Sequence, residues 1–152
     1  MEYVRELLGN RIFWSAVIGW FAAQASKNLL EFCKGEHTKD RLTGGGGMPS
    51  AHSATVVSLA SAVAIVEGMG GGSFVVALFL AFIVIYDALG VRYTTGREAA
   101  ALNRIRQAQI ERGEEPCIDK PLQEHMGHTL AEVIAGGVIG LAASIIVCIL
   151  VP

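Results

Sequence analysis

The stretch GGGGMPSAHSA, residues Gly44–Ala54, decides this fold, and it leads directly into an apolar segment rich in small residues. Glycines let backbone N–H groups turn toward a ligand, and a helix N-terminus carries partial positive charge, so this place suits an anion such as phosphate. Pro49 fits the first turn of a helix, and Ser50 or Ser53 can cap it. His52 would then lie at the helix start, where an imidazole can exchange protons near neutral pH. The plain alternative is a flexible loop before an ordinary helix with a capping serine.

The chain contains four apolar runs: one precedes this stretch, one begins within it, and two follow it. Of the 152 residues, 52% are hydrophobic and 17% are charged, and each run approaches the roughly 20 residues that a helix needs to cross a bilayer. We therefore predict an all-α, polytopic integral membrane protein with four transmembrane helices plus a helix in a polar loop, built as a single membrane domain over residues 1–152. The predicted spans are residues 12–32, 51–69, 74–91 and 130–151, and the polar loop covers residues 93–127.

The composition argues against several other classes of protein. A formal net charge of −2 argues against a nucleic-acid partner. The N-terminal segment MEYVRELLGNR lacks the basic region and cleavage site of a secretory signal, so the first apolar run is expected to be retained. The cysteines have no paired spacing, which predicts neither a disulfide framework nor a zinc site; they are Cys33, Cys117 and Cys148.

The polar loop contains a second kind of helix. GREAAALNRIRQAQIERG, residues 96–113, is rich in good helix formers. Leu102, Ile105 and Ile110 give it only a partial apolar face, so it is either solvated or lies on the bilayer. EEPCIDKP, residues 114–121, is expected to break it.

Threading four spans alternately across a membrane brings the polar residues of the spans to one face. Ten of the twelve lysines and arginines fall on that side, which places it in the cytoplasm by the positive-inside rule. We therefore predict a multi-pass protein of the cell membrane whose site faces the cytoplasm. Lys27 lies inside the first span, where an ionisable residue is functional by default, the alternative being a lysine that snorkels to the interface. The polar residues on this face include Lys27, Arg41, His52, Asp87, Arg92, His128 and Glu132.

A second histidine site begins the last span. His128 and Glu132 are four residues apart and share one helix face. A carboxylate there can accept a hydrogen bond from one imidazole nitrogen and leave the other as a nucleophile or base. Two alternatives stay open: a polar helix start with no chemistry, and a metal site formed with His125. Further along the same span, Gly136 and Gly140 form a small-residue pair that predicts helix contact in a homodimer.

Taken together, these motifs resemble the type-2 phosphatidic acid phosphatase superfamily, which includes the vanadium haloperoxidases, and more closely its divergent, short membrane branch. The resemblance runs from about Trp20 to Gly140 and is carried by WFAAQASK (20–27), GGMPSAHSATV (46–56), YDALGVRYTTGREAAALN (86–103) and HMGHTLAEV (125–133). The superfamily has a Pro-Ser-Gly-His-like motif, matched here by residues 49–52. It also has a histidine followed four residues later by an aspartate, matched by His128 and Glu132.

The resemblance implies hydrolysis of a phosphomonoester or diphosphate of a lipid through a phosphohistidine, without metal or cofactor. It implies that His128 attacks phosphorus, that Glu132 orients His128, and that His52 protonates the leaving oxygen. Its partners would be membrane lipids and a phosphorylated lipid substrate, with no nucleic acid. The phosphate-binding residues would be Lys27, Arg41, Ser50 and Arg92.

The chain departs from the superfamily pattern in several places. Lys34 and Gly35 stand where the first motif has Arg-Pro, and Arg41, the candidate replacement, is followed by leucine rather than proline. Leu122 stands where the third motif has an arginine, for which Arg92 or Arg97 can substitute. Four spans instead of six would leave the site open or require a partner subunit.

Asp87 has no counterpart in the superfamily motifs. It would position Arg92 or His52, or bind a cation. These departures keep two other functions open: a catalytically silent membrane protein that binds phosphorylated lipids or organises a complex, and a metal-dependent hydrolase.

Overall fold

The computed structural model describes residues 1–34 and 46–150, and in these ranges the chain is all-helical, without a strand. The predicted spans correspond closely to four of the helices, because apolar run length and the flanking polar residues fix helix bounds locally. Arg41 lies outside the described residues. The helices are α1 (Glu2–Leu8), α2 (Arg11–Lys34), α4 (Ala51–Val66), α5 (Gly72–Leu89), α6 (Val91–Glu111) and α7 (Leu130–Leu150).

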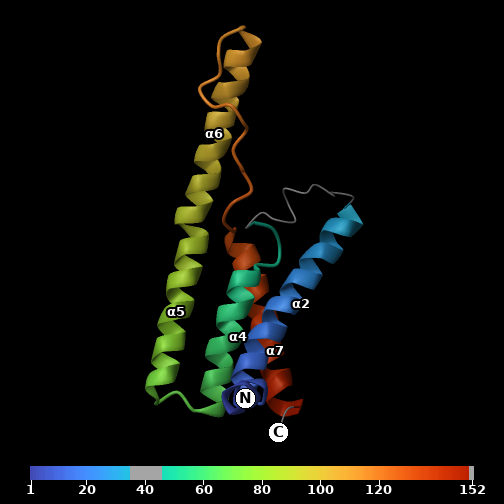
Figure 1. The fold of residues 1–152 in the computed structure, drawn as a ribbon, viewed down its shortest axis with the longest axis vertical. Coiled ribbons are helices and arrows are strands. Elements are labelled where there is room, and N and C mark those ends of the chain that lie inside the picture. Colours follow the sequence, from blue (N-terminus) through green and yellow to red (C-terminus); the bar gives the residue numbers. More distant parts are fainter. Residues whose placement is uncertain (35–45, 151–152) are drawn as a thin grey trace.

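Helix α4 is the centre of the bundle. It packs against α2, α5 and α7, and α2 also packs against α7, whereas α5 barely touches α7 (Figure 1). Small residues make these close contacts possible. A Cβ at Gly140 would overlap the carbonyl oxygen of Ala54 on α4, and a Cβ at Gly19 on α2 would come within 2.8 Å of the Ser58 Cβ. The hydroxyl of Ser58 donates to the carbonyl of Ser15 at 2.6 Å and closes the contact between α2 and α4.

The glycine pair on α7 therefore has a different partner from the one predicted. Gly136 lies against the carbonyl of Ser50 and Gly140 against that of Ala54, and both glycines are buried. The predicted helix contact exists, but it joins α7 to α4 of the same chain rather than to a second copy. The pair is not exposed for dimerisation, because α4 already covers it. Whether two copies associate stays a prediction.

The large apolar side chains point outward while small residues fill the interior. The buried apolar residues are mostly alanines, such as Ala54, Ala62 and Ala81, whereas Phe79, Ile83 and many others are exposed. Soluble monomers rarely expose apolar surface on this scale, and helices that face lipid routinely do. In the described part, two helical stretches are long and apolar enough to cross a membrane, Gly72–Glu111 and Leu130–Leu150, and α4 is apolar but shorter. The four-span prediction is thus confirmed in part.

Helix α6 begins earlier than predicted and continues the line of α5. The two meet at Gly90, so the helix expected from residue 96 starts at Val91, and it extends well beyond the rest of the bundle (Figure 1). It ends at Glu111, before the predicted breaker, and Gly113 follows with a positive φ of 72°.

Side chains of α6 bind the segment that returns toward α7. Asn103 both donates to and accepts from the backbone of Leu122, at 2.8 Å each. Further along, Arg106 donates to the carbonyls of Ile118 and Asp119, and Gln109 accepts from the N–H of Cys117. Polar side chains of α6 therefore hold the return segment by hydrogen bonds to its backbone. The pattern of apolar residues along α6 does not reveal these contacts.

Candidate active site

The two sequence motifs that contain histidine meet at one end of the bundle. His52 lies in the first turn of α4 and His128 lies just before α7, and these helix starts sit at the end opposite the N-terminus (Figure 1). The two imidazole rings approach edge to face, with centroids 5.8 Å apart and an interplanar angle of 61°. Residues 76 positions apart in the sequence thus share one site.

His128 is the more deeply buried of the pair, with 4% of its surface exposed. Its Nδ1 lies 3.1 Å from Oε2 of Glu132. An ionised carboxylate only accepts, so this contact places the ring proton on Nδ1 and leaves a lone pair on Nε2. Within the described residues, Nε2 is a buried nitrogen without a hydrogen-bond partner. A buried polar atom left unpaired costs free energy, which is expected where a ligand completes the site.

Glu132 is itself held by the start of α7. Its Oε2 accepts from the backbone N–H of Thr129 at 3.1 Å, and its own N–H donates to the Thr129 hydroxyl at 3.4 Å. This reciprocal pair is a capping box, and Thr-Leu-Ala-Glu at 129–132 is its sequence signature. Thr129 was not among the predicted site residues, although its signature is present in the sequence. The same carboxylate therefore orients His128 and stabilises the helix start.

Backbone hydrogen bonds join the PSAH segment (Pro49–His52) to α7, and join the residues just before α7 to α5. The N–H of Ser50 donates to the carbonyl of Glu132 at 3.0 Å, and the N–H of His128 donates to the carbonyl of Ala88 at 3.0 Å. Ser50 is the N-cap of α4, and its buried hydroxyl oxygen accepts from the N–H and the hydroxyl of Ser53. With both lone pairs in use, the Ser50 hydroxyl keeps its proton for donation to a ligand. No sequence signal pointed to Ala88.

Lys27 does not snorkel toward lipid. It is buried, with 5% of its surface exposed, and its Nζ donates to the carbonyl of Gly46 at 2.5 Å. Gly47, with φ of 99°, lets the loop close over this side chain, since a Cβ there would come within 2.9 Å of Lys27 Cε. The glycines before the PSAH segment thus place backbone against the buried lysine.

A second cation reaches the site from the junction of α5 and α6. Arg92 Nε pairs with Asp87 Oδ2 at 2.5 Å, and Arg92 leaves 47% of its side chain exposed. Arg92, Asp87, Lys27 and His128 all exert an electrostatic effect on His52. The structure therefore brings residues of α2, α4, α5 and α6 together near His128, and Asp87 is paired with Arg92.

Arg97, the other arginine candidate among the described residues, is placed differently. Arg97 is exposed and lies beside Thr94, Glu98 and Arg104 in a shallow hollow on α6. It follows Arg92 by five residues, which rotates it about 140° around the helix. Of these two arginines, Arg92 is the one held at the junction of α5 and α6 by Asp87.

Leu122, in the place of the third-motif arginine, lies away from the histidines. It is bound to Asn103, eleven residues beyond Arg92 on α6, which corresponds to about 16 Å along the helix axis. An arginine at this position would not be next to the site.

The metal alternative finds no support in the donor geometry. His125, His128 and Glu132 all belong to the described residues, and they do not form a group of three that could hold a metal ion. His125 is exposed, while His128 is buried and already paired with Glu132. The i, i+3 spacing fails here because residues 125–128 precede α7 and are not helical.

Comparison with known proteins gives two matches. A family model described as the divergent PAP2 family matches residues 8–143, a range that includes every described residue of the site. The uncharacterized membrane protein YuiD of Bacillus subtilis (strain 168) is 31% identical over 151 residues, covering 93% of this chain and 96% of the relative. No solved structure matches the chain significantly.

Proposed function

The chain belongs to the divergent PAP2 family, and from that premise we propose that it is an integral membrane phosphatase that hydrolyses a phosphomonoester or diphosphate of a lipid. The observation that carries this proposal is the buried, unpartnered Nε2 of His128 beside the ring of His52. A nucleophilic histidine and a second titratable histidine at one helix-lined site are the groups that phosphoryl transfer through a phosphohistidine requires.

The reaction proceeds in two displacements. In the first, the Nε2 lone pair of His128 forms a bond to phosphorus, the bond to the leaving oxygen breaks, and His52 gives that oxygen a proton. In the second, His52 takes a proton from water, the resulting hydroxide oxygen bonds to phosphorus, and the nitrogen–phosphorus bond breaks to release phosphate. Glu132 stabilises the positive charge that develops on His128.

Stabilisation of charge on the phosphoryl oxygens is the larger contribution to catalysis. Phosphoryl transfer depends mainly on positioning and electrostatics. Arg92 and Lys27 supply positive charge, Ser50 supplies a hydroxyl donor, and the starts of α4 and α7 add their helix dipoles. Arg41, which lies outside the described residues, remains a proposed contributor.

The membrane setting selects the substrate class. We place α2, α4, α5 and α7 across the bilayer, with the site at the cytoplasmic face because the lysines and arginines are concentrated there. Apolar outer surfaces on α5 and α7 support this arrangement. A phosphate group on a lipid reaches a site at this depth while its hydrocarbon tail stays in the membrane. Phosphatidate, phosphatidylglycerophosphate and polyprenyl diphosphates all meet this requirement.

Phosphate release by purified protein from these three lipids tests the proposal. His128→Ala is expected to abolish release, and His125→Ala, a nearby exposed histidine, is expected to leave it unchanged. A phosphoenzyme that is labile in acid and stable in base should be trapped in the wild type and be absent from His128→Ala. Unaltered phosphate release by His128→Ala would overturn the proposal.

A catalytically silent lipid-binding role is the second candidate. The pairing of Arg92 with Asp87 favours it, because a neutralised guanidinium stabilises a transition state less well than a free one. This function predicts binding of phosphorylated lipids without turnover, and little change in that binding in His52→Ala and His128→Ala. Equilibrium binding to phosphatidate vesicles, measured alongside phosphate release, separates the two functions.

A further inference from the structure

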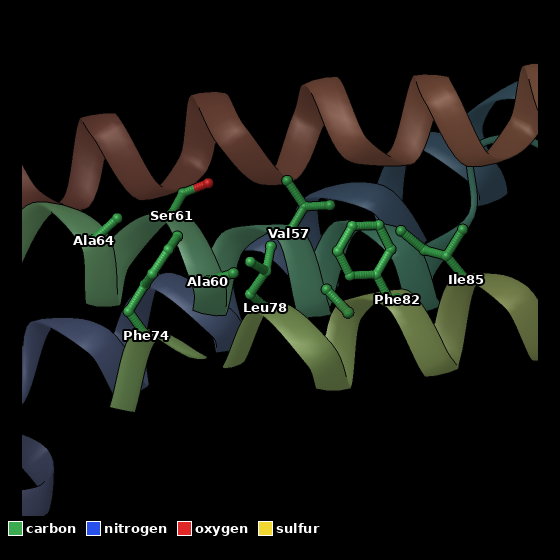
Figure 2. Close-up of a pocket in the computed structure, with 9 residues that line it drawn as sticks. Val57, Ala60, Ser61, Ala64, Phe74, Leu78, Phe82 and Ile85 are labelled. Atoms are coloured by element: carbon green, nitrogen blue, oxygen red, sulfur yellow. The ribbon is translucent and has the colours of Figure 1, made fainter. Parts of the chain in front are cut away.

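An apolar groove runs along the faces of α4 and α5 that point toward one another (Figure 2). Its volume is about 340 Å³, and every side chain in it except that of Ser61 is hydrocarbon. From Phe74 to Ile85 it covers twelve residues of α5, or about 16 Å of helix. The residues lining it on α4 are Val57, Ala60, Ser61 and Ala64, and those on α5 are Phe74, Leu78, Ala81, Phe82 and Ile85.

The groove exists because its floor is built of small side chains. Ala60 and Ala81 are buried there, and α5 barely contacts α7 at this level. Larger residues at these alanines would fill the space, since their methyl groups point into it. The opening is therefore a property of side-chain size on two named helix faces rather than of loose packing between the helices.

The end of the groove at Ile85 leads to the histidine site. On α5, the face formed by Leu78, Ala81 and Ile85 continues with Ala88 at the same helical spacing. The carbonyl of Ala88 accepts the backbone N–H of His128. The end of the groove thus lies one helical turn below the residue that anchors the nucleophile's backbone.

Charge distribution along this path matches a molecule with two different ends. The groove has no charged side chain, whereas the site above it holds Lys27, Arg92 and two histidines. An anionic head with a long hydrocarbon tail is complementary to both parts at once. A second apolar protein helix would match the groove alone and would bring no anionic group to the site above it.

We propose that this groove binds one hydrocarbon tail of the phosphorylated lipid whose phosphate the histidine pair holds. The proposal rests on the proposed function for the identity of the head group. It adds a specificity site: the tail, inserted between α4 and α5, contributes to substrate affinity and sets a preference for long-chain over short-chain phosphate esters.

Substitutions that fill the groove test this through substrate chain length. Ala81→Leu and Ala60→Leu are expected to raise the KM for dioleoyl phosphatidate on the order of tenfold, as when about two methylene groups lose apolar contact. The same variants should leave hydrolysis of water-soluble phenyl phosphate unchanged. Val76→Phe, on an exposed part of α5 outside the groove, is the matched control and should affect neither substrate. Equal losses on both substrates, or none on dioleoyl phosphatidate, would overturn the proposal.

Photocrosslinking gives a readout that does not depend on turnover. The full chain and its His128→Gln variant are placed in phosphatidylcholine nanodiscs with phosphatidate that carries a diazirine in its acyl chain, and labelled residues are located by mass spectrometry. Label should concentrate on Val57, Leu78 and Phe82 over the exposed Val76 and Ile83, and unlabelled phosphatidate should compete it away. Label spread evenly over α5, or not competed by phosphatidate, would refute the groove. A chain with no phosphatase activity but with competed groove labelling would refute only the proposed function.

Discussion

Arg92 donates from Nε to Oδ2 of Asp87 across the junction of α5 and α6, five residues apart on either side of Gly90. The pair fixes a guanidinium that both affects His52 and stays partly exposed. We propose that Asp87 positions Arg92, and that this pair replaces the arginine that the superfamily places just before its last histidine.

Asp87→Asn is expected to impair phosphate release while barely changing stability. An exposed ion pair contributes at most about 1 kcal/mol to folding, so the thermal midpoint should stay close to that of the wild type. Loss of a fixed guanidinium should lower kcat/KM on the order of tenfold, with Asp87→Glu restoring part of it. Glu114→Gln, which breaks the exposed Arg112–Glu114 pair away from the site, is the control and should change neither quantity. An Asp87→Asn variant with full activity would show that Arg92 needs no such support.

Leu122→Arg is expected to leave activity unchanged, although it recreates the arginine of the superfamily's third motif. Leu122 is held against Asn103, about 16 Å along α6 from Arg92. Arg92→Lys, in contrast, should lower phosphate release, because an ammonium cannot reproduce the planar fork of a guanidinium. Steady-state kinetics on phosphatidate would compare the two variants. A gain of activity in Leu122→Arg would contradict the placement of this segment.

Glu132→Gln and Thr129→Ala are expected to separate the two roles of the capping box. Thr129→Ala removes the hydroxyl that caps α7 and should cost about 1 kcal/mol of stability. Most activity should be retained, because the backbone N–H of residue 129 still donates to the Glu132 carboxylate. Glu132→Gln should lower phosphate release by roughly 10²-fold or more, as when a carboxylate that orients a catalytic histidine is lost. Thermal unfolding and phosphate release, measured on both variants, provide the comparison. Equal effects of both on activity would mean that Glu132 serves only to cap the helix.

Gly140→Ala is expected to destabilise the bundle, because its Cβ would overlap the Ala54 carbonyl on α4. The backbone shift needed to relieve this contact costs typically about 1–3 kcal/mol. Gly137→Ala is the matched control on the same helix: its Cβ would meet only Val57 Cγ2, at an ordinary 3.7 Å, so it should be neutral or slightly stabilising. The measurement is the thermal midpoint in mild detergent. A Gly140→Ala variant as stable as Gly137→Ala would place the α4–α7 contact elsewhere.

Much of the site could be recognised from the sequence alone. The motifs around His52 and His128 and the four-residue spacing to Glu132 are local patterns. So are the apolar runs, whose lengths predicted the bounds of α2, α4, α5 and α7 closely. The early start of α6 was missed because residues 93–96, Tyr-Thr-Thr-Gly, are weak helix formers. Gly96 packs against the backbone of Glu124 and Met126, a contact that the sequence pattern does not reveal. The capping role of Thr129 was also within reach, since the Thr-x-x-Glu signature is local.

The contacts between segments that are distant in sequence were decided only by the tertiary structure. The partner of Gly136 and Gly140 proved to be α4, because close backbone approach depends on which neighbouring helix presents small residues opposite these glycines. The separation of Leu122 from Arg92 depended on how the return segment lies along α6. Helix formation is governed by neighbours three and four residues apart, so sequence patterns report it directly. The meeting of two imidazoles from different helices is governed by packing over the whole bundle, which no single stretch of sequence contains.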